Sequence, residues 1–130
     1  MYDVEGRYYL VDLPGYGYAR APKGERAAFR RLLERYLTGR DALAGAVWLL
    51  DIRHDPSRDD QAMGDLLAAH QMPVLVALTK SDKLPLGRRR DRRRVIAGAV
   101  GIPEEQCIMT SARTNLGIAD LRASIEELVA

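Results

Sequence analysis

Polar and glycine residues follow three apolar runs of the chain, at the points where strands would end. They are Asp12-Leu13-Pro14-Gly15, Thr79-Lys80-Ser81-Asp82 and Thr110-Ser111-Ala112. Ligands of parallel sheets bind at the carboxyl ends of the strands. The segments occur in one order, with 67 residues from Asp12 to Thr79 and 29 from Asp82 to Ser111, and this conjunction is more specific than any segment alone. They are therefore the candidates for one shared site.

Asp12 and Gly15 have the chemistry for contact with phosphate groups. A carboxylate can hold the water shell of a Mg²⁺ ion that bridges phosphates, and a glycine lets a backbone N–H approach a terminal phosphate because no Cβ is in the way. A strand that ends in an ordinary Pro-Gly turn is an equally good interpretation of this segment alone. Another apolar run ends at Asp51, which is either a second magnesium-side carboxylate or a cap for the loop beyond it.

The second and third segments have the chemistry for reading a guanine base. The carboxylate of Asp82 can accept hydrogen bonds from the ring N–H and the exocyclic amine of guanine, and adenine offers no such pair of donors. Lys80 can lay its aliphatic stem across the base. The small residues of Thr110-Ser111-Ala112 let a backbone N–H reach the guanine carbonyl oxygen. A Lys-x-Asp sequence is usually a solvated loop, so its place at a strand end carries the interpretation.

The segments between these loops alternate between strand and helix patterns. Apolar spacing predicts a hairpin from residues 2–4 and 8–11, strands at 46–51, 73–79 and 106–110, and helices at 24–40, after Ser57, at 88–100 and at 117–129. Ser57 and Asp60 form a predicted capping box. In the last helix we expect four apolar side chains to face inward: Ile118, Leu121, Ile125 and Leu128. The alternation predicts one three-layer α/β domain over residues 1–130.

With these motifs the chain resembles the P-loop GTPases, and more narrowly the EngB (YihA, YsxC) family within the TrmE-Era-EngA-EngB-Septin-like class. The resemblance runs from about Tyr8 to the C-terminus. It is carried by residues 11–19 (VDLPGYGYA), 51–54 (DIRH) and 79–84 (TKSDKL). It implies a Ras-like three-layer sheet, GTP or GDP with Mg²⁺ as ligands, and a role in assembling the large ribosomal subunit that is linked to cell division and septation.

The resemblance also implies roles for particular residues. Asp12 would contact Mg²⁺ through water, Gly15 the γ-phosphate, Lys80 and Asp82 the guanine, and Ala112 its carbonyl oxygen. The other members of the three segments complete the expected nucleotide-binding set: Leu13, Pro14, Thr79, Ser81, Thr110 and Ser111. No catalytic residue is assigned, because Tyr16 stands where Ras-type enzymes place the glutamine that orients the attacking water.

The chain departs from the family at its start. The Gly-x-x-x-x-Gly-Lys-Ser/Thr loop, which supplies most phosphate contacts, does not occur in these residues, and neither does the switch threonine expected before Tyr2. We therefore interpret Met1 as a truncated start and expect this chain to bind GTP poorly. The missing first strand would lie between strands 8–11 and 46–51, so its absence is expected to leave two unpaired edges.

Composition bounds the remaining possibilities. A net charge of +2 permits an RNA-rich partner without requiring one, and the arginines at 88–90 and 92–94 either contact ribosomal RNA phosphates or form a solvated helix start. Cys107 is expected to be a small apolar filler. With no apolar run long enough to span a bilayer and no signal peptide, we expect a cytoplasmic monomer without membrane contact. The alternative function is a non-enzymatic interaction module that keeps the fold without binding nucleotide.

Overall fold

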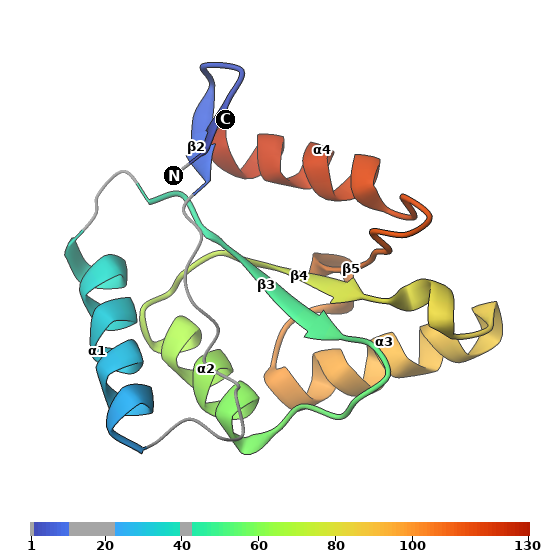
Figure 1. The fold of residues 1–130 in the computed structure, drawn as a ribbon, viewed down its shortest axis with the longest axis horizontal. Coiled ribbons are helices and arrows are strands. Elements are labelled where there is room, and N and C mark those ends of the chain that lie inside the picture. Colours follow the sequence, from blue (N-terminus) through green and yellow to red (C-terminus); the bar gives the residue numbers. More distant parts are fainter. Residues whose placement is uncertain (1, 11–22, 40–42) are drawn as a thin grey trace.

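A sheet of three parallel strands forms the centre of the molecule (Figure 1). The computed structural model describes residues 2–10, 23–39 and 43–130. Strands β3 (Ala46–Asp51), β4 (Val74–Thr79) and β5 (Cys107–Met109) lie in the order β3-β4-β5. Their register pairs Trp48 with Val76 and Ala77 with Ile108. The three strands therefore end at the same edge of the sheet.

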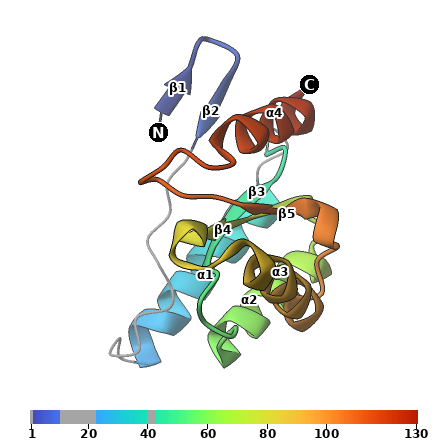
Figure 2. The same cartoon turned by 90° about the vertical axis from the view of Figure 1, so that its right-hand side faces the viewer.

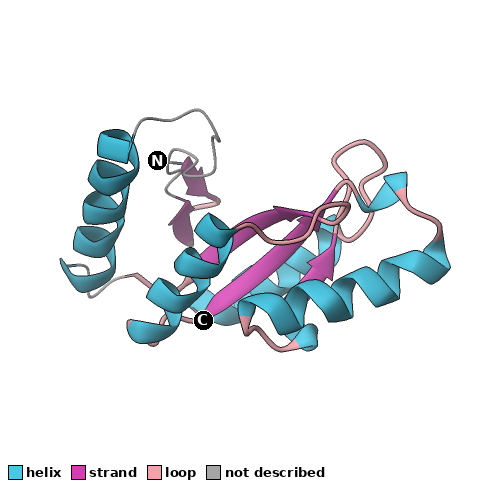
Figure 3. Cartoon of the chain, turned by 90° about the horizontal axis from the view of Figure 1, so that it is seen from below, coloured by secondary structure: helices cyan, strands magenta, loops and turns pink. Residues whose placement is uncertain are grey.

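Helices cover both faces of this sheet. The helices α1 (Lys23–Gly39), α2 (Arg58–Ala69) and α3 (Leu86–Val100) lie on one side, and α4 (Ile118–Val129) lies on the other (Figures 1 and 3). Two short 3-10 helices, η1 (Ser81–Lys83) and η2 (Glu104–Gln106), follow β4 and precede β5. The three-layer α/β architecture is confirmed. Within the described residues, no helix has both the length and the hydropathy needed to cross a membrane.

The core lies between the sheet and helices α2 and α3. Val76, Leu78, Ile52 and Ile96 are completely buried, and β4, the middle strand, is buried along most of its length. Since β4 is covered on both sides, its apolar run Val74–Thr79 is continuous, as expected for a central parallel strand. Cys107 is also buried in this core, which confirms its interpretation as an apolar filler.

Helix α2 begins with the predicted capping box. The Ser57 hydroxyl accepts a hydrogen bond from the Asp60 backbone N–H (3.1 Å), and the Asp60 carboxylate accepts one from the Ser57 N–H (2.8 Å). Such a box satisfies backbone donors that the first turn of a helix leaves without partners. The expected apolar stripe of α2 is also observed, because Leu66 and Leu67 are buried and Met63 packs against the core.

The N-terminal hairpin forms a separate two-stranded sheet (Figure 2). Strands β1 (Tyr2–Val4) and β2 (Tyr8–Leu10) pair only with each other among the described residues. An exposed ion pair between Arg7 and Glu126, 3.8 Å apart, joins the hairpin to α4. Because β2 does not pair with β3, the two strands form edges of two different sheets, as the sequence led us to expect.

Helix α4 differs from expectation. Its apolar stripe was predicted to face inward, yet none of its residues is buried, Ile118 is 42% exposed, and Leu121, Ile125 and Leu128 are only partly buried. Leu49 alternates with buried Trp48 and Leu50, so it points to the α4 face of the sheet, where it is 65% exposed. The described residues therefore cover this face incompletely, which explains the exposure of Ile118.

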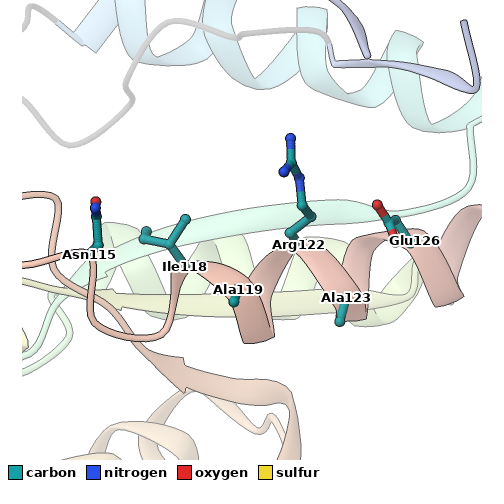
Figure 4. Close-up of a pocket in the computed structure, with 6 residues that line it drawn as sticks. All are labelled: Asn115, Ile118, Ala119, Arg122, Ala123 and Glu126. Atoms are coloured by element: carbon teal, nitrogen blue, oxygen red, sulfur yellow. The ribbon is translucent and has the colours of Figure 1, made fainter. Parts of the chain in front are cut away.

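An open hollow of about 440 Å³ runs along one side of α4 (Figure 4). Its lining residues are Asn115, Ile118, Ala119, Arg122, Ala123 and Glu126. They recur at helical spacing, so they form one face of the helix. Apart from Asn115, this face does not include residues of the loops that follow the strands.

Candidate functional site

The loops that follow β3, β4 and β5 gather at the right-hand edge of the sheet in Figure 1. They bring together the seven candidate residues of the second and third segments: Thr79, Lys80, Ser81, Asp82, Thr110, Ser111 and Ala112. The four residues of the first segment, Asp12, Leu13, Pro14 and Gly15, lie outside the described residues. The described residues therefore form the side of the site that we predicted would face the base.

Buried hydroxyl groups tie the β4 and β5 loops together. Ser81 is completely buried; its N–H donates to the Thr110 carbonyl oxygen (3.0 Å) and its hydroxyl to the Leu78 carbonyl oxygen (2.8 Å). The Thr110 N–H and hydroxyl also donate to that Leu78 oxygen, at 2.8 and 3.2 Å. Ser81 and Thr110 therefore fix the loop backbones, and their side chains are not available to a ligand.

Lys80 adopts an uncommon backbone conformation. Its φ of 59° lies in the left-handed region, which costs a residue with a Cβ about 1 to 3 kcal/mol. The turn is closed by a hydrogen bond from the Lys83 N–H to the Lys80 carbonyl oxygen (3.0 Å). It sends the Lys80 side chain, 57% exposed, toward the loop after β3, where its Nζ lies 3.6 Å from Oδ2 of Asp51.

The carboxyl group of Asp82 lies beside the β5 loop. A hydrogen bond from the side chain of Ser111 lowers the pKa of Asp82, and the charges of Lys83 and Arg113 lower it further. Ser111 is itself buried, and its hydroxyl accepts the Thr114 N–H (3.2 Å). Asp82 is therefore held as a partly exposed carboxylate that can accept two N–H donors from a ligand.

Asp51, the last residue of β3, is the charged centre of the turn that follows the strand. Its Oδ1 accepts the Arg53 backbone N–H (2.9 Å) and Nε (3.1 Å), and its Oδ2 accepts Arg53 Nη2 (2.8 Å). The hydrogen bond from the Arg53 side chain lowers the pKa of Asp51 to about 2. These contacts agree with the interpretation of Asp51 as a loop cap. Among the described residues, no three His, Cys, Asp or Glu side chains form a cluster that could hold a metal ion.

The loop between β5 and α4 depends on a glycine that the sequence analysis did not single out. Gly117 has a φ of 69°, and a Cβ at this position would collide with the carbonyl oxygen of Met109. The Ser111 N–H donates to the Leu116 carbonyl oxygen (3.0 Å), which closes the loop and leaves Ala112 exposed at its rim. The available signal was a glycine at the first position of the helix predicted over residues 117–129.

Five of the six arginines in the run of α3 divide into two sets, and the sixth, Arg93, is partly buried. Arg92 is inside the fold: its Nε donates to the Ile52 carbonyl oxygen (2.9 Å) and its Nη1 to Asp55 (2.7 Å). Arg89 likewise donates to the Leu84 carbonyl oxygen (2.8 Å). Arg88, Arg90 and Arg94 are exposed. Only part of the run is therefore available to a partner.

The fold is shared with a solved protein. A crystal structure described as that of a probable GTP-binding protein EngB superposes with a TM-score of 0.77 at 20% sequence identity, and the match covers 91% of this chain and 74% of that one. A parallel sheet covered on both faces, with loops gathered at the strand ends, is part of a Ras-like P-loop GTPase fold. The chain thus belongs to this structural class.

Sequence comparison identifies the family within that class. The matched proteins are each named probable GTP-binding protein EngB. That of Syntrophomonas wolfei is 41% identical over 98% of this chain, that of Gemmatimonas aurantiaca 42% over 99%, and that of a Geobacillus strain 36% over 98%. The matches cover 66%, 63% and 67% of these relatives, so the chain spans about two thirds of their length. No protein-family model matches the chain. The chain belongs to the EngB family.

Proposed function

We propose that this chain forms the guanine-recognition part of a protein that binds and hydrolyses GTP. The EngB relatives are named as probable GTP-binding proteins, which supports GTP binding by the complete protein. The observation that carries the proposal is the juxtaposition of two loops. Asp82, whose pKa is lowered by the hydrogen bond from Ser111, lies two residues after Lys80 at the carboxyl end of the central strand. A carboxylate and a long aliphatic stem are suited to the edge and the face of a purine.

In this proposal each loop contributes one kind of contact to the base. The Asp82 carboxylate accepts the ring N–H and the exocyclic amine of guanine, which an adenine cannot offer. The stem of Lys80 lies across the ring, and the exposed backbone at Ala112 donates to the guanine carbonyl oxygen. Ser81 and Thr110 keep the two loops in register, because their hydrogen bonds join the backbones of β4 and β5.

The phosphate side of the site belongs to a part of the protein that the described residues do not include. By resemblance, Gly15 contacts the γ-phosphate and Asp12 a water of the Mg²⁺ ion, which would neutralise charge on the phosphates. Since the chain contains no Gly-x-x-x-x-Gly-Lys-Ser/Thr loop, we infer that upstream residues supply it in the complete protein. With Tyr16 in place of a water-orienting glutamine, we expect hydrolysis by the isolated protein to be slow.

The proposal is tested on the protein extended upstream with its coding sequence. Asp82→Asn should weaken GTP binding by about a hundredfold, because two hydrogen bonds to a charged acceptor are lost, and should improve the binding of xanthosine triphosphate. Titration calorimetry with both nucleotides measures this preference. Asp65→Asn, on the exposed side of α2, is the matched control and should behave like the wild type. If Asp82→Asn kept the wild-type preference for GTP over xanthosine triphosphate, Asp82 would not be the residue that contacts the guanine base.

The finer role that we propose is assembly of the large ribosomal subunit, with its link to cell division and septation. The exposed guanidinium groups of Arg88, Arg90 and Arg94 are compatible with RNA phosphates. Cosedimentation of the extended protein with large subunits should depend on GTP and weaken when these three arginines are replaced by glutamine. Sedimentation that is equal with GTP, with GDP and without nucleotide would argue against it.

The absence of the phosphate-loop motif from this sequence also favours a second candidate, a non-enzymatic interaction module with the same fold. The two candidates differ in their response to nucleotide. GTP and GDP should raise the melting temperature of a GTP-binding protein and leave that of the module unchanged. Recovery of an upstream phosphate loop would support the first candidate, and a genuine start at Met1 the second.

A further inference from the structure

Asp51 is the last residue of β3, outside the two loops that we assign to the base, yet it contacts Lys80. The Lys80 ammonium lies 3.6 Å from Oδ2 of Asp51. Lys80 is 57% exposed, so apolar packing does not hold its side chain in one place. The Asp51 side chain is only 21% exposed and stands at the carboxyl end of β3. The carboxylate, which Arg53 holds in place, can therefore anchor the exposed ammonium of Lys80.

The two oxygens of the Asp51 carboxylate have different surroundings. Oδ1 accepts the backbone N–H and Nε of Arg53, which is sufficient to cap the loop. Oδ2 accepts Arg53 Nη2 and also faces His54 Nε2 at 3.7 Å and Lys80 Nζ. Capping alone does not need the contact with Lys80. Oδ2 thus connects the β3 loop to the β4 loop.

Arg53 extends the same network toward Asp82. The carboxylate of Asp51 raises the pKa of Arg53 through a hydrogen bond and through its charge, and the charge of Asp82 raises that pKa further. One guanidinium therefore lies in the field of both carboxylates, with Lys80 beside Asp51. Asp51 and Arg53 thus interact with both base-side residues, Lys80 and Asp82, although β3 itself makes no contact with the base in our proposal.

We propose that Asp51 is a positioning residue of the guanine site, which holds the Lys80 ammonium so that the lysine stem lies across the base. This inference rests on the proposed function. A lysine that is ordered before the ligand arrives loses less conformational freedom on binding. Arg53 fixes the carboxylate, and the carboxylate fixes Lys80.

A double-mutant cycle in the upstream-extended protein tests this role. Asp51→Asn should weaken GDP binding about tenfold, which is the cost of ordering one long side chain. Lys80→Met, which removes the ammonium and keeps an apolar side chain, should abolish the effect of Asp51→Asn, so that the double variant binds no more weakly than Lys80→Met alone. Asp55→Asn is the matched control. It lies in the same loop but pairs with Arg92 of α3, and its affinity should equal that of the wild type.

The possible outcomes separate the inference from the proposed function. Additive effects of Asp51→Asn and Lys80→Met would mean that Asp51 only caps its loop, and an unchanged affinity in Asp51→Asn would exclude any role in binding. Either result overturns the inference while GDP binding by the wild type still supports the proposed function. If the wild type itself does not bind GDP, the proposed function fails and the inference fails with it. Circular dichroism of each variant excludes loss of the fold as the cause of weaker binding.

Discussion

The three-stranded sheet and the N-terminal hairpin of this chain differ in how their strands are supported. Val76 and Leu78 of the central strand β4 are completely inaccessible to solvent, and so is Ile96 of α3, which belongs to the same core. In the hairpin, Tyr9 is 65% and Leu10 is 41% exposed, and the described strands pair only with each other. An isolated two-stranded hairpin is marginally stable in water. Stability in this chain is therefore concentrated around β3, β4 and β5.

The described part of the candidate site belongs to the three-stranded sheet and not to the hairpin. Its loops leave the ends of buried strands and are joined by the hydrogen bonds of Ser81 and Thr110. The phosphate-side segment, residues 12–15, follows the hairpin in sequence. The loops that we propose for base recognition can thus be ordered by the local core.

The two regions should differ most in the loss of unfolding free energy that follows the removal of one apolar side chain from each. Ile96→Ala removes a completely buried side chain and should lower the free energy of unfolding by about 3 to 4 kcal/mol. Leu10→Ala, in the hairpin, should lower it by less than about 1 kcal/mol, because Leu10 is already 41% exposed. Urea unfolding followed by circular dichroism measures both. Equal losses would show that the hairpin shares the core of the sheet.

The fold could be predicted from the sequence wherever local pattern decides the structure. Strand β3 has the predicted bounds, and the predicted helix at 88–100 begins two residues earlier, at Leu86. Ser57 and Asp60 were recognised as a capping box because that motif needs only residues three positions apart. The gathering of the Asp82 and Ser111 loops also followed, since parallel strands end at one edge.

The rest depends on contacts between distant residues, which the pattern does not contain. Periodicity identified the apolar face of α4, but it cannot show whether other residues cover that face, and Ile118 is exposed. The contact between Asp51 and Lys80 joins the last residue of β3 to the turn after β4 and depends on the left-handed conformation of Lys80. The segment at Asp12 lies outside the described residues, so its role stays a prediction.

A smaller change in stability is expected when a glycine is replaced by alanine, and its sign should differ between the loop before α4 and the surface of α3. Gly117→Ala places a Cβ against the Met109 carbonyl oxygen at a positive φ and should destabilise the protein by about 2 kcal/mol. Gly98→Ala is the matched control: it lies within α3, where a Cβ meets no other atom, and should stabilise the protein by about 0.5 to 1 kcal/mol. Thermal and urea unfolding of the two variants measure the expected loss of stability in Gly117→Ala and the expected gain in Gly98→Ala. A neutral Gly117→Ala would contradict the close approach to Met109.

The smallest effect concerns the charges that hold the strand-end loops. The pKa of Asp51 is about 2 in the folded protein and near its ordinary value of 3.8 in the unfolded chain. Because the folded pKa is the lower one, ionised Asp51 stabilises the fold above about pH 4, and this contribution is lost as the pH falls toward 2. Arg53 and Lys80 are 37% and 57% exposed, so solvent screening reduces the contribution to about 1 kcal/mol.

Urea unfolding of the wild type and Asp51→Asn at constant ionic strength, from pH 6 to pH 2, measures that contribution. The variant should be less stable by about 1 kcal/mol at pH 6, and the difference should shrink between pH 4 and pH 2 as the wild-type carboxylate takes up its proton. Asp65→Asn, at an exposed position of α2, should show no comparable change. A difference that stays constant down to pH 2 would mean that Asp51 supports its loop through shape and neutral hydrogen bonds. In that case the charge of Asp51 would add nothing to the stability of the fold, and the buried backbone contacts between β4 and β5 would be what orders the site.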